Sequence, residues 1–416
     1  MADLGSMQDR YAELAIRTGV NIQPGQVLMV VAALEAAPFV RALARYAYAA
    51  GAHDVHVLWE DPLFDRVRLE HAPEAALNEY PRHVAAWFEE VVAGGGARVR
   101  VSAPHPGVYD GVPPTRVATA AKAQQHAMRR VMQAAINMEI NWLVVAAPTQ
   151  AWADRVLPEL PAGERVDALW GYILRATRMD QPDPLAAWRA HAADLDRRAE
   201  ALQRHHFRYL RYRAPGTDLT IELPAEHHWV RATDTVNARG VPFIPNLPTE
   251  EVFSAPLRGG TEGVVRSTLP LVYRDTVIEG LTLHFRAGRI VSFDATAGRD
   301  AFAGLLDTDE GSAYLGEVAL VPVDSPIART GKLFFNTLFD ENASCHLAVG
   351  DAYPVCIAGG QQMDPETIRA KGLNSSASHV DFMVGSPELD IDGESQDGRV
   401  VPVFRRGNWA SGLEGS

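Results

Sequence analysis

Acid, imidazole, thiol and phenol side chains lie close together in the stretch NTLFDENASCHLAVGDAYP, residues 336–354. Its chemically active members are Asp340, Glu341, Cys345, His346 and Tyr353. The run is typical of neither a regular helix nor a regular strand. Residues of these types suit three kinds of structure: a polar loop, a Cys–His nucleophile pair, or part of a metal centre.

Two adjacent acids lie in a second stretch, PNLPTEEVFSAP, residues 245–256. Glu250 and Glu251 are flanked there by apolar side chains such as Val252 and Phe253. By themselves, the two acids are typical of a solvated turn. A carboxylate held among apolar side chains needs a partner, however, and a metal ion is one such partner.

Three further candidates lie nearer the C-terminus. Glu317 comes just before the apolar run 318–321, which predicts a strand. His379 and Asp381 are two residues apart in SASHVDFMVG. Residues i and i+2 of a strand share one face, so this imidazole and this carboxylate are expected to project together, with Val380 and Phe382 on the other face.

Together these segments could form a dinuclear metal site. The candidate ligands are the carboxylates of Glu251, Glu317, Glu341 and Asp381 and the imidazoles of His346 and His379. Four carboxylates would balance the charge of two divalent cations, and a mixed set of oxygen and nitrogen ligands suits Zn, Co or Mn. Spacing along the chain does not by itself require these segments to converge.

Two alternatives remain open at this point. One is a Cys–His amidohydrolase that uses Cys345, and the other is a non-catalytic metal-binding protein. Adjacent residues of a strand point to opposite faces, so Cys345 and His346 are poorly placed to bond each other, and we expect Cys345 to pack. The motifs HExxH, GxSxG and GxxxxGK[ST] do not occur in the sequence, so zincin, α/β-hydrolase and P-loop enzymes lack support.

The first half of the chain predicts an α/β domain. Apolar, β-branched runs indicate strands at residues 26–33, 54–61, 97–104 and 141–148, with a helix at about 36–50 and further helical segments between the later strands. Alternating strands and helices favour a mainly parallel sheet.

The second half predicts a β-rich, α+β domain. A long helix is expected from Pro184 to His205, with Asp183 as its N-cap, and His205 and His206 at its end are expected to be solvated. Hairpins are expected around residues 214–216 and around 287–288. The predicted domains are therefore residues 1–205 and residues 206–416.

Composition excludes several classes of protein. The chain has 416 residues, 47% of them hydrophobic, and a formal net charge of −13. This acidic balance argues against a nucleic-acid partner. We see neither a secretory signal nor an apolar run of the ~20 residues that a membrane span needs. Cys345 and Cys356 are the only cysteines, which favours reduced thiols and a cytoplasmic location.

The motifs resemble the aminopeptidase T / aminopeptidase S family of dinuclear metallo-aminopeptidases. The resemblance is carried by YAELAIRTGVNIQPGQ, NLPTEEVF, GEVALVP, SPI, LFFNTLFDENASCHLAVGDAYP and HVDFMVG, and it covers essentially the whole chain. It implies an N-terminal α/β domain and a C-terminal catalytic domain that holds both metals. It also implies a homodimer whose active sites face an internal cavity, and release of N-terminal residues from peptides.

The resemblance also implies roles for individual residues. It assigns the metal-ligand role to Glu251, Glu317, Glu341, His346, His379 and Asp381, with Glu317 as the bridging ligand. Tyr353 would assist the tetrahedral intermediate. Because Glu250 lies beside a ligand, we expect it to be the general base. The expected cofactors are two divalent ions per chain, Zn or Co, with Mn or Mg as alternatives.

Overall fold

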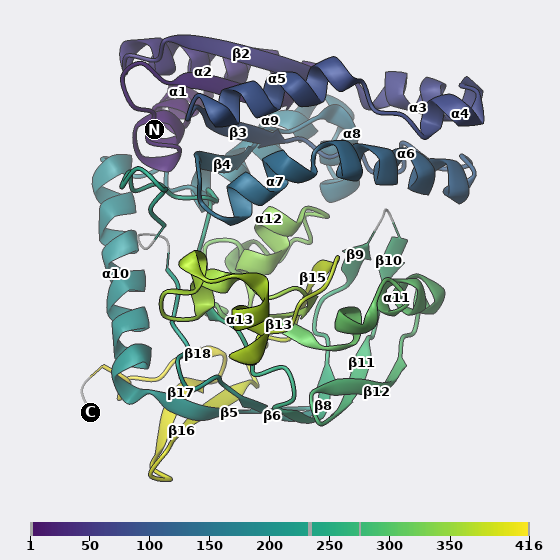
Figure 1. Ribbon diagram of the computed structural model, residues 1–416. Coiled ribbons are helices and arrows are strands. Elements are labelled where there is room, and N and C mark those ends of the chain that lie inside the picture. Colours follow the sequence, from purple (N-terminus) through teal and green to yellow (C-terminus); the bar gives the residue numbers. More distant parts are fainter. Residues whose placement is uncertain (1–2, 232–234, 274–275, 415–416) are drawn as a thin grey trace. The chain divides into compact units, whose positions relative to one another are not determined.

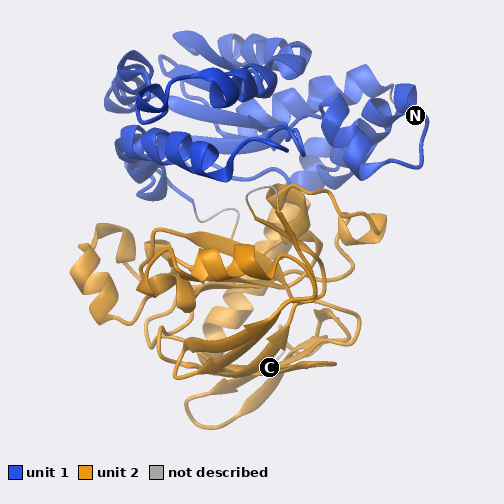
Figure 2. Ribbon diagram, turned by 90° about the vertical axis from the view of Figure 1, so that its right-hand side faces the viewer, with its two compact units in different colours: residues 1–188, 233–248 blue, residues 189–232, 249–416 orange. Residues whose placement is uncertain are grey.

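The computed structural model describes residues 3–231, 235–273 and 276–414. Contacts divide the chain into two compact units, unit 1 with residues 1–188 and 233–248, and unit 2 with residues 189–232 and 249–416 (Figure 2). These bounds differ from the predicted domains, because the long linking helix lies mostly in unit 2 and a later segment returns to unit 1. That segment bonds to the strand 141–146. Val144 N donates to Pro245 O at 2.7 Å, and the carbonyl oxygen of Val144 accepts from Leu247 N at 3.0 Å.

Unit 1 contains a four-stranded parallel sheet in the order β2-β1-β3-β4 (Figure 1). Its strands are β1 (Val27–Ala33), β2 (Asp54–Glu60), β3 (Ala97–Ser102) and β4 (Asn141–Ala146). The apolar strand β1 is paired on both sides and is buried after its first residue. Inner strands of parallel sheets are apolar because both faces are covered. The prediction of a parallel sheet is confirmed.

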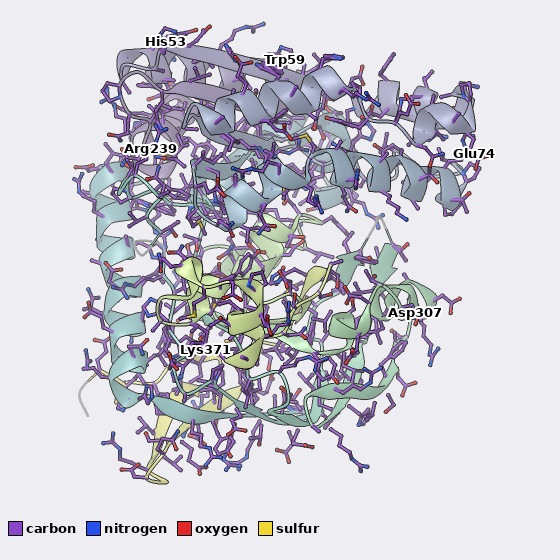
Figure 3. The ribbon with its side chains drawn as sticks, viewed as in Figure 1. His53, Trp59, Glu74, Arg239, Asp307 and Lys371 are labelled. Carbon is purple, nitrogen blue, oxygen red and sulfur yellow. The ribbon has the colours of Figure 1, made fainter. Side chains whose placement is uncertain are left out.

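Helices make up most of the rest of unit 1. They are α1 (Leu4–Leu14), α2 (Ala37–Ala49), α3 (Pro62–His71), α4 (Glu74–Leu77), α5 (Arg82–Ala93), α6 (Pro114–Ala127), α7 (Arg129–Ile136), α8 (Gln150–Val156) and α9 (Ala162–Ala176). Helix α1 continues into a π-helical turn, Ala15–Gly19. Figure 3 shows Trp59 on the edge strand β2 and Glu74 at the start of α4.

The long helix α10 (Pro184–His205) begins and ends where the sequence predicts. The side chain of Asp183 caps it by accepting from Ala186 N at 3.0 Å. His206 is exposed. The expectation that His205 is solvated is wrong, because its Nε2 lies 3.0 Å from the carbonyl oxygen of Leu413 and the residue is buried. No helix in the described ranges is both long enough and apolar enough to cross a membrane.

Unit 2 contains an eight-stranded antiparallel sheet in the order β12-β11-β8-β6-β5-β16-β17-β18. Its strands are β5 (Phe207–Ala214), β6 (Thr217–Glu222), β8 (Thr261–Arg266), β11 (Thr282–Arg286), β12 (Arg289–Asp294), β16 (Asp390–Ser395), β17 (Val400–Arg405) and β18 (Asn408–Trp409). Both predicted hairpins are present, as β5–β6 and β11–β12. Gly216 and Gly288 supply the positive φ angles, 81° and 77°, that their tight turns need.

A second antiparallel sheet of unit 2, in the order β15-β14-β13-β7, carries most of the chemically active residues. Its strands are β7 (Val252–Ser254), β13 (Leu315–Leu320), β14 (His346–Gly350) and β15 (His379–Met383). The shorter elements of unit 2 are the strand pair β9 (Leu271–Tyr273) and β10 (Thr276–Ile278) and the helices α11 (Arg299–Leu306), α12 (Thr337–Asp340) and α13 (Pro365–Ala370).

The stretch 336–354 is more regular than its sequence suggests. It forms helix α12, then a 3-10 turn (Glu341–Ala343), then strand β14. The carboxylate of Asp340 accepts from Phe334 N at 2.7 Å and from Asn336 N at 2.9 Å. These bonds close the turn in front of α12, so a helix of one turn is held by a buried side chain rather than by a periodic apolar pattern.

Candidate metal centre

One face of the sheet β15-β14-β13-β7 brings together acids and histidines from distant parts of the sequence. In the strand register, Glu317 on β13 is opposite Ala348 on β14, which is opposite Asp381 on β15. Paired residues of antiparallel strands share a face, with Cβ atoms about 5 Å apart. The same face also carries His346, whose partner on β13 is Ala319. The small side chain of Ala348 leaves space between the two acids.

The opposite face of the sheet belongs to the apolar core. It carries Val318 on β13, Leu347 on β14 and Phe382 on β15, all of them buried. Val380 points the same way as Phe382, as the sequence predicts from the alternation along β15. Apolar packing behind the sheet therefore fixes the strands that hold the polar residues in front.

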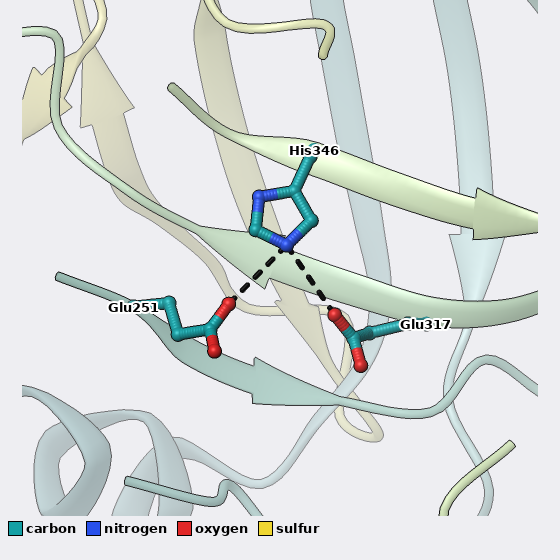
Figure 4. Close-up of side chains that lie close together, drawn as sticks. All are labelled: Glu251, Glu317 and His346. Atoms are coloured by element: carbon teal, nitrogen blue, oxygen red, sulfur yellow. Dashed lines mark ion pairs between the residues drawn. The ribbon is translucent and has the colours of Figure 1, made fainter. Parts of the chain in front are cut away.

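His346 faces two carboxylates (Figure 4). Its Nε2 lies 3.2 Å from Glu251 Oε2 and 3.3 Å from Glu317 Oε1. Its Nδ1 lies 3.2 Å from the carbonyl oxygen of Ser344, to which it donates when it carries the proton. Burial alone would lower the pKa of His346, but the adjacent carboxylates raise it well above its ordinary value.

His379 repeats this arrangement on β15. Its Nε2 lies 3.4 Å from Asp381 Oδ1 and 3.8 Å from Glu317 Oε2. Its Nδ1 lies 2.8 Å from the carbonyl oxygen of Asp351. Burial opposes protonation, yet the charge of Asp381 and its contact with the ring outweigh burial and raise the pKa of His379 to about 10.

The donor set fits divalent cations. In each histidine, a backbone carbonyl oxygen accepts the proton of Nδ1, so the lone pair of Nε2 points at carboxylate oxygens. Two lone pairs that face each other repel, so a proton or a cation must lie between Nε2 and the carboxylates. Asp381 Oδ1 is buried and has no hydrogen-bond partner of ordinary geometry among the described residues, and the nearest nitrogen, His379 Nε2, lies 3.4 Å away. Ligand atoms within 4.8 Å of one another form two groups, Glu251–Glu317–His346 and Glu317–His379–Asp381. Glu317 belongs to both.

Glu341 is the sixth predicted ligand and belongs to neither group. Its Oε1 accepts a hydrogen bond of 3.4 Å from Asn342 Nδ2. Burial raises the pKa of Glu341 well above its usual range, and the charges of Asp381 and Glu251 raise it further. The carboxylate therefore lies within the electrostatic field of the other acids, where a cation would favour its ionised form.

Glu250 has different surroundings from Glu251. It is only 4% exposed, and its backbone N donates to Asn342 Oδ1 at 2.7 Å. Its Oε2 lies 3.7 Å from Nε2 of His191 on α10, a residue that the sequence patterns did not single out. Glu250 is absent from both groups of potential ligand atoms, whereas Glu251 contributes to one.

Tyr353 lies beside the histidine of β15. Its ring centroid is 4.9 Å from that of His379 and 6.2 Å from that of Phe253. Burial raises the pKa of Tyr353 well above 10, and the charges of Glu317 and Asp381 act in the same direction. The phenol therefore keeps its proton and can act as a hydrogen-bond donor.

Cys345 has the properties of a packing residue. It is 1% exposed, and its Sγ donates to the carbonyl oxygen of Val321 at 3.4 Å. Burial raises the pKa of its thiol to about 12. A nucleophilic cysteine needs a thiolate, and this environment disfavours one. Cys345 and Cys356 are both free, as the sequence predicts.

Comparisons with known proteins identify the chain. The model of the thermophilic metalloprotease (M29) family matches residues 6–409. The chain is a member of this metalloprotease family. Aminopeptidase 2 of Geobacillus stearothermophilus is 46% identical over 402 residues, which cover 97% of each chain. Aminopeptidase T of Thermus aquaticus is 45% identical over 405 residues, which cover 96% of this chain and 98% of the relative.

The solved structure of wild-type AmpT from Thermus thermophilus has the same fold as this M29 protein. It superposes with a TM-score of 0.92 at 41% identity, and the alignment covers 98% of this chain and 100% of the other. The family resemblance and the enzyme class predicted from the sequence, a metal-dependent aminopeptidase, are confirmed. Membership of a metalloprotease family also implies a divalent metal cofactor.

Proposed function

We propose that this M29 enzyme uses two divalent ions to release N-terminal residues from peptides. The observation that carries the proposal is the pair of potential ligand groups that share Glu317. The first ion would be held by Glu251, Glu317 and His346, and the second by Glu317, His379 and Asp381. Glu341 would complete the set. Zn or Co suits these mixed ligands, and Mn or Mg are the alternatives.

The metals would supply a Lewis acid and an ionised water at neutral pH. The protein's own residues would transfer the protons and stabilise the developing negative charge. Glu250 would take the proton of the attacking water and pass it to the leaving amine, since it is a buried carboxylate next to a ligand. The O–H of Tyr353 would donate to the oxygen of the former carbonyl as negative charge develops there. A free α-amine of the substrate would bind one of the metals or an acidic side chain, which would restrict the reaction to N-termini.

The restriction to N-termini can be tested together with the metal requirement. After verified removal of metal by a strong chelator, we expect release of the N-terminal residue from a chromogenic aminoacyl amide to stop, and to return with added Co or Zn. The N-acetylated amide should be refused. Full activity of the metal-free protein would contradict the proposal, and loss of activity on thiol alkylation alone would favour a Cys345 nucleophile instead.

Further features belong to the same proposal. The family resemblance implies a homodimer that acts on peptides. The two reduced cysteines favour a cytoplasmic location, and composition argues against nucleic-acid and membrane partners. The net charge of −13 supports the absence of a nucleic-acid partner. Sedimentation of the purified protein tests the dimer, because a monomer at micromolar concentration would contradict it.

A further inference from the structure

One buried amide side chain links the two acidic segments of the proposed centre. Asn342 is 0% exposed and follows Glu341 in the 3-10 turn after α12. Its Oδ1 accepts from Glu250 N at 2.7 Å. Its Nδ2 donates to the carbonyl oxygen of Leu338 at 3.0 Å and to Glu341 Oε1 at 3.4 Å.

The bonds of this carboxamide permit only one orientation. Reversing the amide would place Nδ2 against the N–H of Glu250 and Oδ1 against two acceptor oxygens, so all three contacts would become repulsive. The backbone is held as well, because Ser325 Oγ donates to the carbonyl oxygen of Asn342 at 2.9 Å. The position of the amide is therefore determined by bonds at both ends of the residue.

We propose that Asn342 is a positioning residue of the metal centre, which holds the Glu250–Glu251 segment and the Glu341 carboxylate at a constant separation. The inference rests on the proposed function, since it assumes that Glu251 and Glu341 bind metal. The planar amide accepts a bond from the Glu250–Glu251 segment and donates to the segment that contains Glu341. A shift of either segment would therefore displace the other. The amide also holds Glu341 Oε1 and so sets the direction of the other carboxylate oxygen.

The structure explains why few other side chains could take this place. A leucine has a similar shape but would leave the N–H of Glu250 and the carbonyl of Leu338 buried without bonds. A serine hydroxyl can accept one of these bonds or donate another, but is too short to span both segments. Only a carboxamide of this length provides an acceptor and two donors in one plane.

Metal affinity tests the inference without relying on turnover. We expect Asn342→Leu to lower the affinity for Zn and Co roughly 10–100-fold, the usual effect of losing a residue that orients metal ligands. Competition with a chromogenic chelator measures the affinity. The visible absorption spectrum of the Co-loaded protein should also change, because the oxygen ligands of Glu341 and Glu251 would be less well placed.

A matched control separates positioning from mere support of the turn. Asn336 caps the same helix α12 by accepting from Leu338 N at 3.2 Å, and its own backbone N donates to Asp340, which is not a candidate ligand. Asn336→Ala should loosen the same turn and keep the affinity and the Co spectrum of the wild type. Equal losses of affinity in the two variants would overturn the inference and leave Asn342 a purely structural residue.

The remaining outcomes are also decisive. If Asn342→Leu does not fold, Asn342→Ser replaces it in the test. We expect Asn342→Ser to fold and to bind metal more weakly than the wild type, with a smaller loss than that expected for Asn342→Leu. Wild-type affinity in Asn342→Ser would overturn the inference. A wild-type protein that binds no metal at all would contradict the proposed function itself. If the wild type binds metal and Asn342→Leu binds it with the same affinity, only the role of Asn342 is contradicted.

Discussion

Glu250 and Glu251 are adjacent in the chain but have separate partners. Glu251 faces His346, whereas Glu250 is held through its backbone by Asn342 and has its carboxylate near His191. Neighbouring Cβ atoms in extended chain point in different directions, so two adjacent acids rarely serve the same centre in the same way. This difference in surroundings supports a ligand role for Glu251 and a proton-transfer role for Glu250.

Replacing each acid by its amide should separate the two roles. Glu251→Gln should reduce metal content, because it removes one of the charges that balance the cations. Glu250→Gln should keep both metals and lower turnover by roughly 10²–10⁴-fold, the usual contribution of a general base. Metal content per chain and the rate at saturating metal are the measurements. Loss of metal only in Glu250→Gln would mean that the two roles must be exchanged.

At the scale of elements, the two faces of the sheet β15-β14-β13-β7 have different roles. One face packs Val318, Leu347 and Phe382 into the core. The other carries the acids and histidines, with the buried alanines Ala319 and Ala348 between them. Larger side chains at these two positions would occupy the space that the ligands surround.

Substitutions on the two faces should therefore differ in their effect on metal binding. Ala348→Leu adds bulk between Glu317 and Asp381 and should lower metal affinity, with a loss of stability of about 1–3 kcal/mol from overpacking. Leu347→Ala removes bulk from the core face and should cost about 2–5 kcal/mol of stability while metal stoichiometry is retained. Denaturant unfolding and metal titration of both variants make the comparison. Unchanged affinity in Ala348→Leu would show that this face does not bind the metals.

At the scale of the whole molecule, His227 connects separate segments of unit 2. It is 2% exposed, forms a β-bridge with Ile357 and accepts a bond through its carbonyl from Gln203. Its Nδ1 lies 2.8 Å from the carbonyl oxygen of Pro224, and its Nε2 is buried with no hydrogen-bond partner in the described part of the chain. Burial lowers the pKa of His227 to about 4, and its neighbour His206 adds to the effect.

Stability should therefore depend on pH through His227. The folded protein keeps this ring neutral, whereas the unfolded chain binds a proton below pH 6.5, so the free energy of unfolding falls as pH decreases from 6.5 to 4. The maximum slope is about 1.4 kcal/mol per pH unit, and the total is on the order of 3 kcal/mol. His227→Asn can keep the bond to Pro224 and should lack this contribution. Denaturant unfolding of both proteins across this pH range should show the wild type losing more stability, and parallel curves would contradict the assignment.

The sequence alone predicted the local elements and a candidate set of metal ligands. The apolar run of β1, the N-cap Asp183 and the glycine turns at 216 and 288 are local signals, because backbone conformation there depends on neighbouring residues. The spacing of His379 and Asp381 predicted a shared face for the same reason. Residue types also indicated an oxygen and nitrogen ligand set for divalent metals.

Only the tertiary structure decided which segments converge. The register that places Glu317 opposite Ala348 and Asp381 depends on pairing between strands far apart in the chain, and no local pattern specifies it. The return of residues 235–248 to unit 1, the burial of His205 and the regular structure within residues 336–350 are non-local in the same sense. Asn342 is the clearest example of a residue that the sequence could not single out. Its proposed role depends entirely on the hydrogen-bond partners that folding places around its side chain.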